Sequence, residues 1–206
     1  MREYRLVITG PTGVGKSTIL NLLTDMTKSI SNKVQIFPEF ISTEFGLRMF
    51  NEYSQGNITA LTFQSYILDY YATFKQEKPI VIFERCIDDT FLVFCKNCVR
   101  THTMTTQEYD TLNSKLSQIK ATHDLPTYTD SNTRVIRMTN DDPEATATDI
   151  INLMQEDREH KITTRIVILK TSLIENEKRI RSRGRNGEEH LTTDYIKHIN
   201  QYYDEI

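Results

Sequence analysis

The residues Gly10-Pro-Thr-Gly13-Val-Gly15-Lys16-Ser17 match the spacing GxxxxGK[ST]. Glycines at these positions let backbone N–H groups surround phosphate oxygens, and a helix that follows adds a favourable dipole. In this pattern the lysine reaches the β- and γ-phosphates and the serine hydroxyl ligates Mg²⁺. The motif therefore predicts a site for ATP and Mg²⁺, but it does not identify the phosphoryl acceptor. The residues that we expect to bind ATP are Gly10, Thr12, Gly13, Val14, Gly15, Lys16, Ser17 and Thr18.

Two acidic residues close apolar segments that have the character of strands. Glu39 follows residues 34–38, and Glu84 follows residues 79–83. In an open α/β sheet the ligand crevice lies outside the carboxyl ends of the strands, so both carboxylates are expected to face the phosphate loop. Phosphoryl transfer needs a base near the acceptor hydroxyl and cations over the transferred group. The two glutamates thus favour a kinase over a simple nucleotide-binding protein.

Four arginines, Arg179, Arg181, Arg183 and Arg185, fall within seven residues near the end of the chain, next to Gly184. One interpretation is a flexible loop that folds over ATP and neutralises developing charge. The alternative is a surface helix end whose arginines oppose the negative end of the helix dipole. The pattern by itself leaves both interpretations open.

The elements that must position these residues alternate between strand and helix. Strands are predicted at residues 5–9, 34–37, 79–83, 134–138 and 165–169. Helices are predicted at residues 16–26, 45–53, 59–74, 87–100, 106–120, 143–159, 173–183 and 192–203, and a polar loop at 122–133. This order indicates an α/β fold of the P-loop NTPase type. We expect three layers around a five-stranded parallel sheet in one domain spanning residues 1–206, with a lid at about 179–190.

Composition excludes several other classes of protein. Hydrophobic residues make up 38% and charged residues 26% of the chain, and the formal net charge is −3, so we expect no nucleic-acid partner. No apolar run approaches the roughly 20 residues that span a bilayer, and from the residues at the start of the sequence we expect no signal peptide. The three cysteines indicate a reducing, cytoplasmic environment. Cys95 and Cys98 have CxxC spacing without the second pair that a zinc site needs.

Three further segments carry a resemblance to a known family. The segments Phe63-Gln64-Ser65-Tyr66 and Phe83-Glu84-Arg85-Cys86, together with the arginine cluster that ends at Asn186, resemble motifs of the deoxynucleoside kinases. That family includes the thymidine, deoxycytidine and deoxyguanosine kinases, and the resemblance covers roughly residues 4–100 and 165–200. It implies an enzyme that transfers the γ-phosphoryl group of ATP to the 5′-hydroxyl of a deoxynucleoside for nucleotide salvage. It also implies a homodimer formed through the helices at 45–74 and 87–120.

The resemblance assigns the catalytic roles residue by residue. Glu39 would take the proton of the 5′-hydroxyl, and Arg85 would orient that hydroxyl and the transferring phosphate. Glu84 would help Ser17 to hold Mg²⁺. Arg183 and Arg185 would be the main lid cations, and Arg179 would also bind ATP.

The substrate roles come from the same resemblance. Gln64 would read the edge of the base through two amide hydrogen bonds, a geometry suited to its side chain. Phe63 and Phe94 would form apolar walls, one of them stacked on the base. Tyr53 and Glu188 would hold the sugar 3′-hydroxyl.

The chain departs from the family pattern in places that bear on specificity. Deoxycytidine-type members carry an Arg and an Asp where this chain has Tyr71 and Thr90, so we expect a preference for thymidine or for pyrimidines in general. The order Pro38-Glu39 reverses the usual Glu-Pro, and the chain contains no tryptophan. Cys86 replaces the usual serine.

Family members also continue into a final strand and helix that contact adenine, whereas this chain carries an extra strand and helix earlier. We hypothesise that residues 134–159 are this unit, relocated in the chain, because a sheet edge can be filled in either order. Asn140, Asp141 and Asp142 would then lie near adenine, with Asp141 as an ATP contact. A structure with residues 135–136 outside the sheet would contradict the hypothesis.

Two alternatives stay open beside the nucleoside kinase. A thymidylate kinase shares Phe37-Pro38-Glu39 and Glu84-Arg85, and it would need an arginine near the acceptor phosphate, for which Arg48 is the candidate. A P-loop switch protein would use ATP without a small acceptor. That class would give Tyr53, Gln64 and Glu188 no function, so the nucleoside kinase is favoured.

Overall fold

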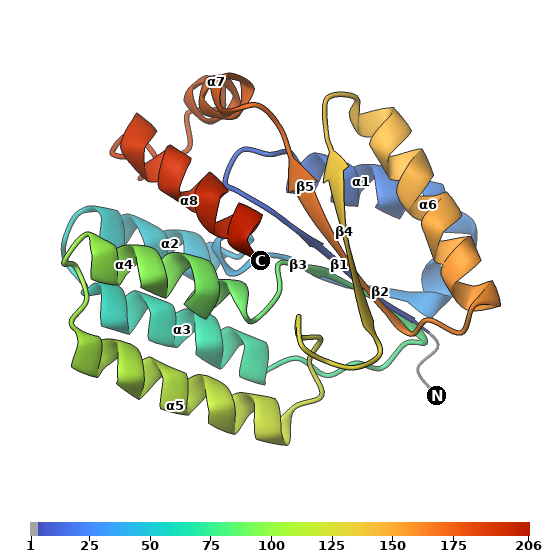
Figure 1. Ribbon diagram of the computed structural model, residues 1–206, viewed down its shortest axis with the longest axis horizontal. Coiled ribbons are helices and arrows are strands. Elements are labelled where there is room, and N and C mark those ends of the chain that lie inside the picture. Colours follow the sequence, from blue (N-terminus) through green and yellow to red (C-terminus); the bar gives the residue numbers. More distant parts are fainter. Residues whose placement is uncertain (1–3) are drawn as a thin grey trace.

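A parallel five-stranded sheet forms the centre of the computed structural model, which describes residues 4–206 (Figure 1). Its strands lie in the order β2-β3-β1-β5-β4, and every pairing is parallel. The strands are β1 (Tyr4–Thr9), β2 (Val34–Phe37), β3 (Ile80–Glu84), β4 (Thr133–Thr139) and β5 (Thr164–Lys170). The predicted fold class is therefore confirmed, and the carboxyl ends of all five strands share one edge.

Helices cover both faces of the sheet (Figure 1). On one face α1 (Lys16–Met26) and α6 (Pro143–Glu159) pack on alternate residues of β1, such as Leu6 and Ile8. On the other face the opposite residues, such as Val7 and Phe83, meet the remaining core helices. Those helices are α3 (Ala60–Ala72), a π-helical turn (Thr90–Cys95), α4 (Lys96–Arg100), α5 (Thr106–Thr122) and α8 (Thr193–Glu205). The remaining helices are α2 (Glu44–Ser54), α7 (Leu173–Arg183) and two short 3-10 helices, Lys28–Lys33 and Phe40–Ser42.

The strand β4, which α6 follows, completes the sheet beside β5. Val135 pairs with Ile166 and Ile136 with Val167, so the segment lies inside the parallel sheet. The side chain of Asp142 caps α6 by accepting hydrogen bonds from the N–H groups of Glu144 (3.0 Å) and Ala145 (3.1 Å), as the Asp-Pro-Glu sequence predicts. The β4–α6 loop consequently opens at the same edge as the phosphate loop.

A buried carboxylate ties α6 to the opposite end of the sheet. Asp157 is 1% exposed and accepts hydrogen bonds from the Tyr4 hydroxyl (2.5 Å) and from Arg165 Nε (2.9 Å). Tyr4 belongs to β1 and Arg165 to β5, so one side chain of α6 is joined to two strands. This arrangement stabilises the packing of the inserted helix.

Two predicted elements differ from the structure in an informative way. The helix predicted at 87–100 begins only at Thr90, because Cys86 to Asp89 form a turn closed by the Asp89 side chain. Arg179, Arg181 and Arg183 lie on α7, which ends at Gly184 with a positive φ of 57°. The loop of the expected lid is therefore confined to the residues after Arg183.

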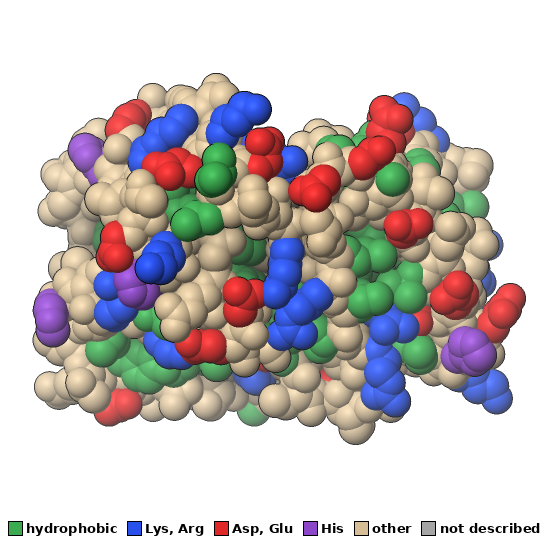
Figure 2. Space-filling model, turned by 45° about the horizontal axis from the view of Figure 1, so that its top comes forward, with side chains coloured by type: hydrophobic (Ala, Val, Ile, Leu, Met, Phe, Trp, Pro, Cys, Tyr) green, Lys and Arg blue, Asp and Glu red, His purple; other side chains and the backbone are tan. Residues whose placement is uncertain are grey.

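The surface has no dominant charge on the face that Figure 2 shows, where acidic and basic side chains are interspersed. All three cysteines are free and buried. Within residues 4–206, no helix is both long and apolar enough to cross a membrane.

Candidate active site

The phosphate loop joins β1 to α1 and is closed by its own lysine. Lys16 is 5% exposed, and its Nζ donates to the carbonyl oxygens of Gly10 (3.3 Å) and Pro11 (3.1 Å). Burial, followed by repulsion from Arg85, lowers the pKa of Lys16 to about 8. A bound phosphate would stabilise the charged ammonium that burial disfavours. The loop is thus prepared to bind an anion.

Asn140, in the β4–α6 loop, packs closely against the phosphate loop. Its Nδ2 donates to the Val14 carbonyl (2.8 Å), and a Cβ atom on Gly15, whose φ is 99°, would lie 2.4 Å from that nitrogen. Arg179 donates from Nη1 to the Val14 carbonyl (3.2 Å) and from Nη2 to the Asn140 carbonyl (3.1 Å). Asp141 is exposed and accepts from Thr171 (3.4 Å). The β4–α6 loop therefore packs on the phosphate loop and helps to shape it.

Glu84, at the end of β3, joins the phosphate loop to the segment after β2. Its Oε1 accepts from the Ser17 hydroxyl (3.0 Å), and its Oε2 accepts from the backbone N–H of Glu39 (3.2 Å). A hydroxyl and a carboxylate beside the phosphates fit Mg²⁺, which is usually held by one or two protein oxygens together with phosphate oxygens and water. The predicted pair, Ser17 and Glu84, thus lies together in the phosphate cavity.

Glu39 and Arg85 form a buried ion pair beside this cavity. The Arg85 Nε donates to the Glu39 carboxylate, and the two side chains are 8% and 14% exposed, respectively. Burial alone would raise the pKa of Glu39, but the charges of Arg85 and Lys16 outweigh it and hold the pKa below its ordinary value. Glu39 is therefore ionised at neutral pH and able to accept a hydrogen bond or a proton.

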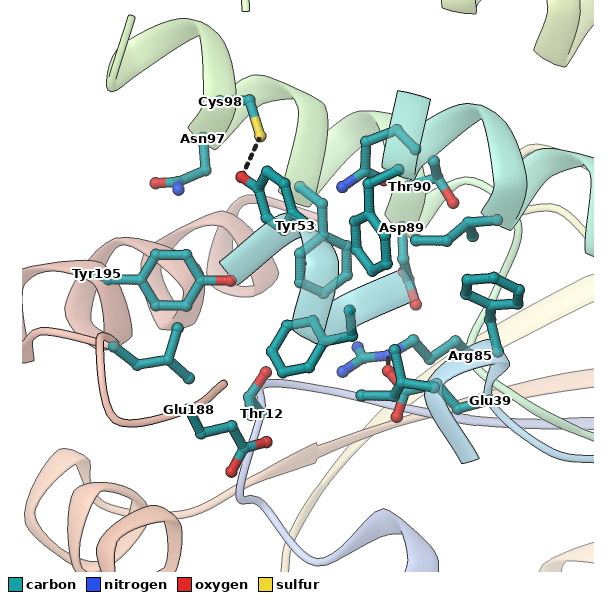
Figure 3. A pocket seen from close by; sticks show the side chains of 18 of the residues that line it. Thr12, Glu39, Tyr53, Arg85, Asp89, Thr90, Asn97, Cys98, Glu188 and Tyr195 are labelled. Atoms are coloured by element: carbon teal, nitrogen blue, oxygen red, sulfur yellow. Dashed lines mark hydrogen bonds and ion pairs between the residues drawn. The ribbon is translucent and has the colours of Figure 1, made fainter. Parts of the chain in front are cut away.

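A largely apolar pocket lies on the far side of this ion pair (Figure 3). Seven residues predicted to bind substrate line it: Tyr53, Phe63, Gln64, Tyr71, Thr90, Phe94 and Glu188. Gln64 is 3% exposed, and its Oε1 has no hydrogen-bond partner within residues 4–206. A buried amide of this kind requires a partner, and a ligand in the pocket could supply it. The dimensions and lining suit a small, flat, partly polar molecule.

The aromatic side chains of the pocket are held by one another and by the helices. Tyr53 stacks on Phe63 with ring centroids 5.0 Å apart, and Phe94 lies under the Arg85 guanidinium at 4.8 Å. The Tyr53 hydroxyl points to the Cys98 sulfur (3.9 Å), as Figure 3 shows, and not to Glu188. Tyr53 and Glu188 therefore line one pocket but have different partners in this structure.

Glu188 pairs with Arg183 and Arg185, the two main arginines of the expected lid. Its carboxylate accepts from Arg183 Nη2 (2.6 Å) and lies 3.6 Å from Arg185 Nη1, and the side chain is only 3% exposed. Both arginines also line the phosphate cavity. The Glu188 carboxylate thus connects the two cavities: it lines the apolar pocket, and it pairs with Arg183 and Arg185, which line the phosphate cavity.

Four residues line both cavities: Thr12, Glu39, Ile41 and Arg85. A group transferred from a nucleotide on the phosphate loop to a molecule in the apolar pocket must pass between them. The junction offers the Glu39 carboxylate, the Arg85 guanidinium and the Thr12 hydroxyl beside the apolar side chain of Ile41. This set of groups is suited to transfer of a phosphoryl group to a hydroxyl.

Several residues at the site were not identified from the sequence. Asp89, Asn97, Cys98, Leu191 and Tyr195 line the apolar pocket, and Tyr203 accepts a hydrogen bond from Arg85. The only available signal was for Asp89, an acidic residue five positions after the strand-end Glu84. Asn97 and Cys98 lie on α4, Tyr195 and Tyr203 on α8, and Leu191 in the segment before α8, and only their positions in space give them a role.

The comparisons with known proteins agree with this geometry. The deoxynucleoside kinase family model matches residues 6–138. No curated protein sequence matches the chain. A similar solved structure is that of deoxyadenosine kinase from M. mycoides with bound dATP, which has 17% sequence identity and a TM-score of 0.60. The alignment covers 98% of this chain and 82% of that chain, and at this identity it supports the fold alone.

Proposed function

The chain belongs to the deoxynucleoside kinase family, and on that premise we propose that it transfers the γ-phosphoryl group of ATP to the 5′-hydroxyl of a deoxynucleoside, with a preference for thymidine or another pyrimidine. The observation that carries the proposal is the meeting of a phosphate cavity and a largely apolar pocket at Glu39, Arg85, Thr12 and Ile41. A nucleoside in the pocket would direct its 5′-hydroxyl to this junction. A triphosphate on the loop would direct its last phosphate there.

The catalytic roles follow from the charges around the junction. Glu39 accepts the proton of the 5′-hydroxyl as the oxygen attacks the γ-phosphorus and the bond to the β-phosphate oxygen breaks, releasing ADP. Arg85 orients the attacking oxygen and stabilises the transferred group, and Lys16 neutralises the β- and γ-phosphates. A Mg²⁺ ion held through Ser17 and Glu84 would neutralise further phosphate charge when bound. Arg183 and Arg185 supply cations from the lid.

Recognition of the nucleoside depends on the unpaired amide and the aromatic walls. Gln64 donates to and accepts from the base edge, since its Oε1 is buried without a partner. Phe63 and Phe94 hold the base plane between them. Tyr71 is 6% exposed and Thr90 is 2% exposed, and neither carries the charge that would favour an amino group on the base. This combination supports the preference for thymidine.

The adenine of ATP would lie toward β4. The apolar pocket occupies the β2 and β3 side of the phosphate loop, so the rest of ATP extends to the β5 and β4 side. Asn140 and Asp141 follow β4 on that side, and Arg179 Nη2 donates a hydrogen bond to the Asn140 carbonyl (3.1 Å). We therefore assign the ATP contacts beyond the phosphates to this loop and to α7.

The thymidylate kinase alternative is disfavoured by Arg48. This arginine is exposed, stacks over the Phe45 ring at 5.3 Å and lines neither cavity. An acceptor monophosphate in the pocket would therefore lack the cation that was its candidate partner. The homodimer implied by the resemblance stays a prediction, which analytical ultracentrifugation would test.

An ATP-consumption assay with thymidine, deoxycytidine, deoxyguanosine, deoxyadenosine and thymidylate, each supplied separately, tests the proposal. Deoxyadenosine is included because of the substrate named for the similar solved structure. We expect turnover with nucleosides and the highest kcat/KM with thymidine. Turnover with thymidylate alone would refute the nucleoside kinase. ATP consumption independent of any acceptor would favour the switch class.

A further inference from the structure

Arg85 is held in a backbone conformation that side chains of its kind rarely adopt. Its φ is 76°, in the left-handed region, and its N–H donates to the Ile8 carbonyl of β1 (3.0 Å). A non-glycine residue keeps such a conformation only when the surrounding structure enforces it, and this commonly occurs at functional sites. The groups that enforce it are therefore candidates for a role in the reaction.

Asp89 closes the turn that follows Arg85. Its Oδ2 accepts from the N–H of Cys86 (3.1 Å) and from the Thr9 hydroxyl, and its Oδ1 accepts from the Tyr128 hydroxyl (2.5 Å). The carboxylate is 1% exposed, so these contacts are screened from water. Three elements, β1, the turn after β3 and the loop after α5, thus meet at one side chain and fix the backbone that carries Arg85.

Tyr203, on α8, holds the other end of the arginine. Its hydroxyl accepts from Arg85 Nη1 (2.8 Å), which also donates to the Gly10 carbonyl (3.0 Å), and it lies 3.3 Å from the Thr9 hydroxyl. Tyr203 is fully buried, and burial raises the pKa of its hydroxyl, which keeps its proton. With Nε on Glu39 and Nη1 on Gly10 and Tyr203, the plane of the guanidinium is fixed.

We propose that Asp89 and Tyr203 are positioning residues of the phosphoryl transfer, Asp89 fixing the backbone turn of Arg85 and Tyr203 fixing its guanidinium plane. The remaining nitrogen, Nη2, donates to no atom within residues 4–206 and is left for the attacking oxygen or the transferred phosphate. Neither positioning residue contributes an atom to the reaction. The expected fall in kcat rests on the proposed function, whereas the fixed position of Arg85 can be measured without substrate.

The test is Tyr203→Phe, which removes one oxygen and keeps the buried ring. The matched control is Tyr202→Phe, because Tyr202 is also buried on α8 but its ring contacts Lys96 (4.6 Å) and not Arg85. We expect kcat of Tyr203→Phe to fall about tenfold, the worth of one hydrogen bond to a charged group, with KM for ATP and melting temperature nearly unchanged. Tyr202→Phe should behave as the wild type.

A second readout does not require turnover. Carbon-13 NMR of the Glu39 carboxyl, assigned with Glu39→Gln, gives its titration midpoint in the free protein. The charges facing Glu39 are those of Arg85, Lys16 and Arg185, and Glu84 accepts its backbone N–H. Of these charged groups, only Arg85 loses a hydrogen-bond partner in Tyr203→Phe, so the midpoint should rise in that variant and not in the control. A solely structural Tyr203 would leave it unchanged.

The outcomes separate the two proposals. If no nucleoside is turned over by the wild type but the Glu39 midpoint rises in Tyr203→Phe, the positioning holds and the proposed function fails. If the wild type is active and Tyr203→Phe changes neither kcat nor the midpoint, the positioning is refuted. Asp89→Asn should lower kcat further; if that variant does not fold, Tyr128→Phe, which removes one hydrogen bond to Asp89, should still lower kcat, and an unchanged kcat would refute the role of Asp89.

Discussion

Substituting Gln64 by methionine should make the free protein more stable and a much poorer enzyme. Gln64 is 3% exposed on α3, and its Oε1 has no partner within residues 4–206. Methionine has a similar length and no amide, so it can occupy the same space without a buried polar group. The two effects have opposite signs because the unpaired amide lowers the stability of the ligand-free protein, whereas it is available to hydrogen-bond the base when substrate is bound.

The magnitude follows from the cost of an unsatisfied buried group. Such a group costs about 1–3 kcal/mol, so Gln64→Met should stabilise the protein by about 1–2 kcal/mol. For chains of this size that corresponds to a rise in melting temperature of about 2–8 °C. Losing two hydrogen bonds to the base should lower kcat/KM for the nucleoside about a hundredfold, with KM for ATP unchanged.

Thermal unfolding without ligands and steady-state kinetics measure the two effects. The matched control is Gln118→Met, which makes the same change at an exposed position of α5 and should alter stability by less than about 0.5 kcal/mol. A Gln64→Met variant that is less stable than the wild type would show that the amide is not unsatisfied in the free protein. A variant that keeps its nucleoside kcat/KM would show that Gln64 does not contact the base.

Three further results are expected. Glu39→Gln should bind ATP normally in calorimetry but lower kcat at least about a hundredfold, since a general base contributes that much; a variant with full turnover would remove Glu39 from the mechanism. Because burial lowers the pKa of Lys16 to about 8, Lys16 loses its charge as the pH rises above 8, and ATP affinity should be constant below that pH and weaken by up to about tenfold per unit above it. Calorimetry between about pH 7 and 9.5 measures this, and an affinity independent of pH would contradict the lowered pKa. Asp157→Ala leaves Tyr4 and Arg165 without a buried partner and should lower stability by about 3 kcal/mol, seen as a melting temperature about 6–12 °C lower with unchanged kinetic constants; a smaller loss would mean that water replaces the carboxylate.

The strand β4 and the helix α6 contribute to the phosphate-loop site although they come late in the chain. β4 and α6 precede β5 in the chain, yet β4 lies outside β5 at the edge of the sheet. The loop between them contributes Asn140, whose Nδ2 supports the phosphate loop at Val14 (2.8 Å). The loop between β4 and α6 is therefore part of the phosphate-binding site, although it lies more than 120 positions after the phosphate loop in the chain.

The local features of the chain could be predicted because each depends on neighbouring residues. The glycine-rich loop before Lys16 reflects the need for close backbone approach to phosphate. The apolar run before Glu84 is that of a parallel strand buried on both faces, and the Asp142-Pro143 pair starts a helix by satisfying its first N–H groups. These patterns were sufficient for the five strands and the phosphate loop, whereas the residues of the apolar pocket were predicted from the family resemblance.

The sequence by itself determined which residue types are available for phosphoryl transfer, and the tertiary structure alone decided how they are held. The phosphate loop could be predicted because its residues, 10–17, are adjacent in the chain. The fixed plane of the Arg85 guanidinium depends on Glu39, Gly10 and Tyr203, and Tyr203 lies 118 positions away in the chain. No periodicity records such a contact, because a buried tyrosine on an amphipathic helix has the same pattern whether or not its hydroxyl meets an arginine.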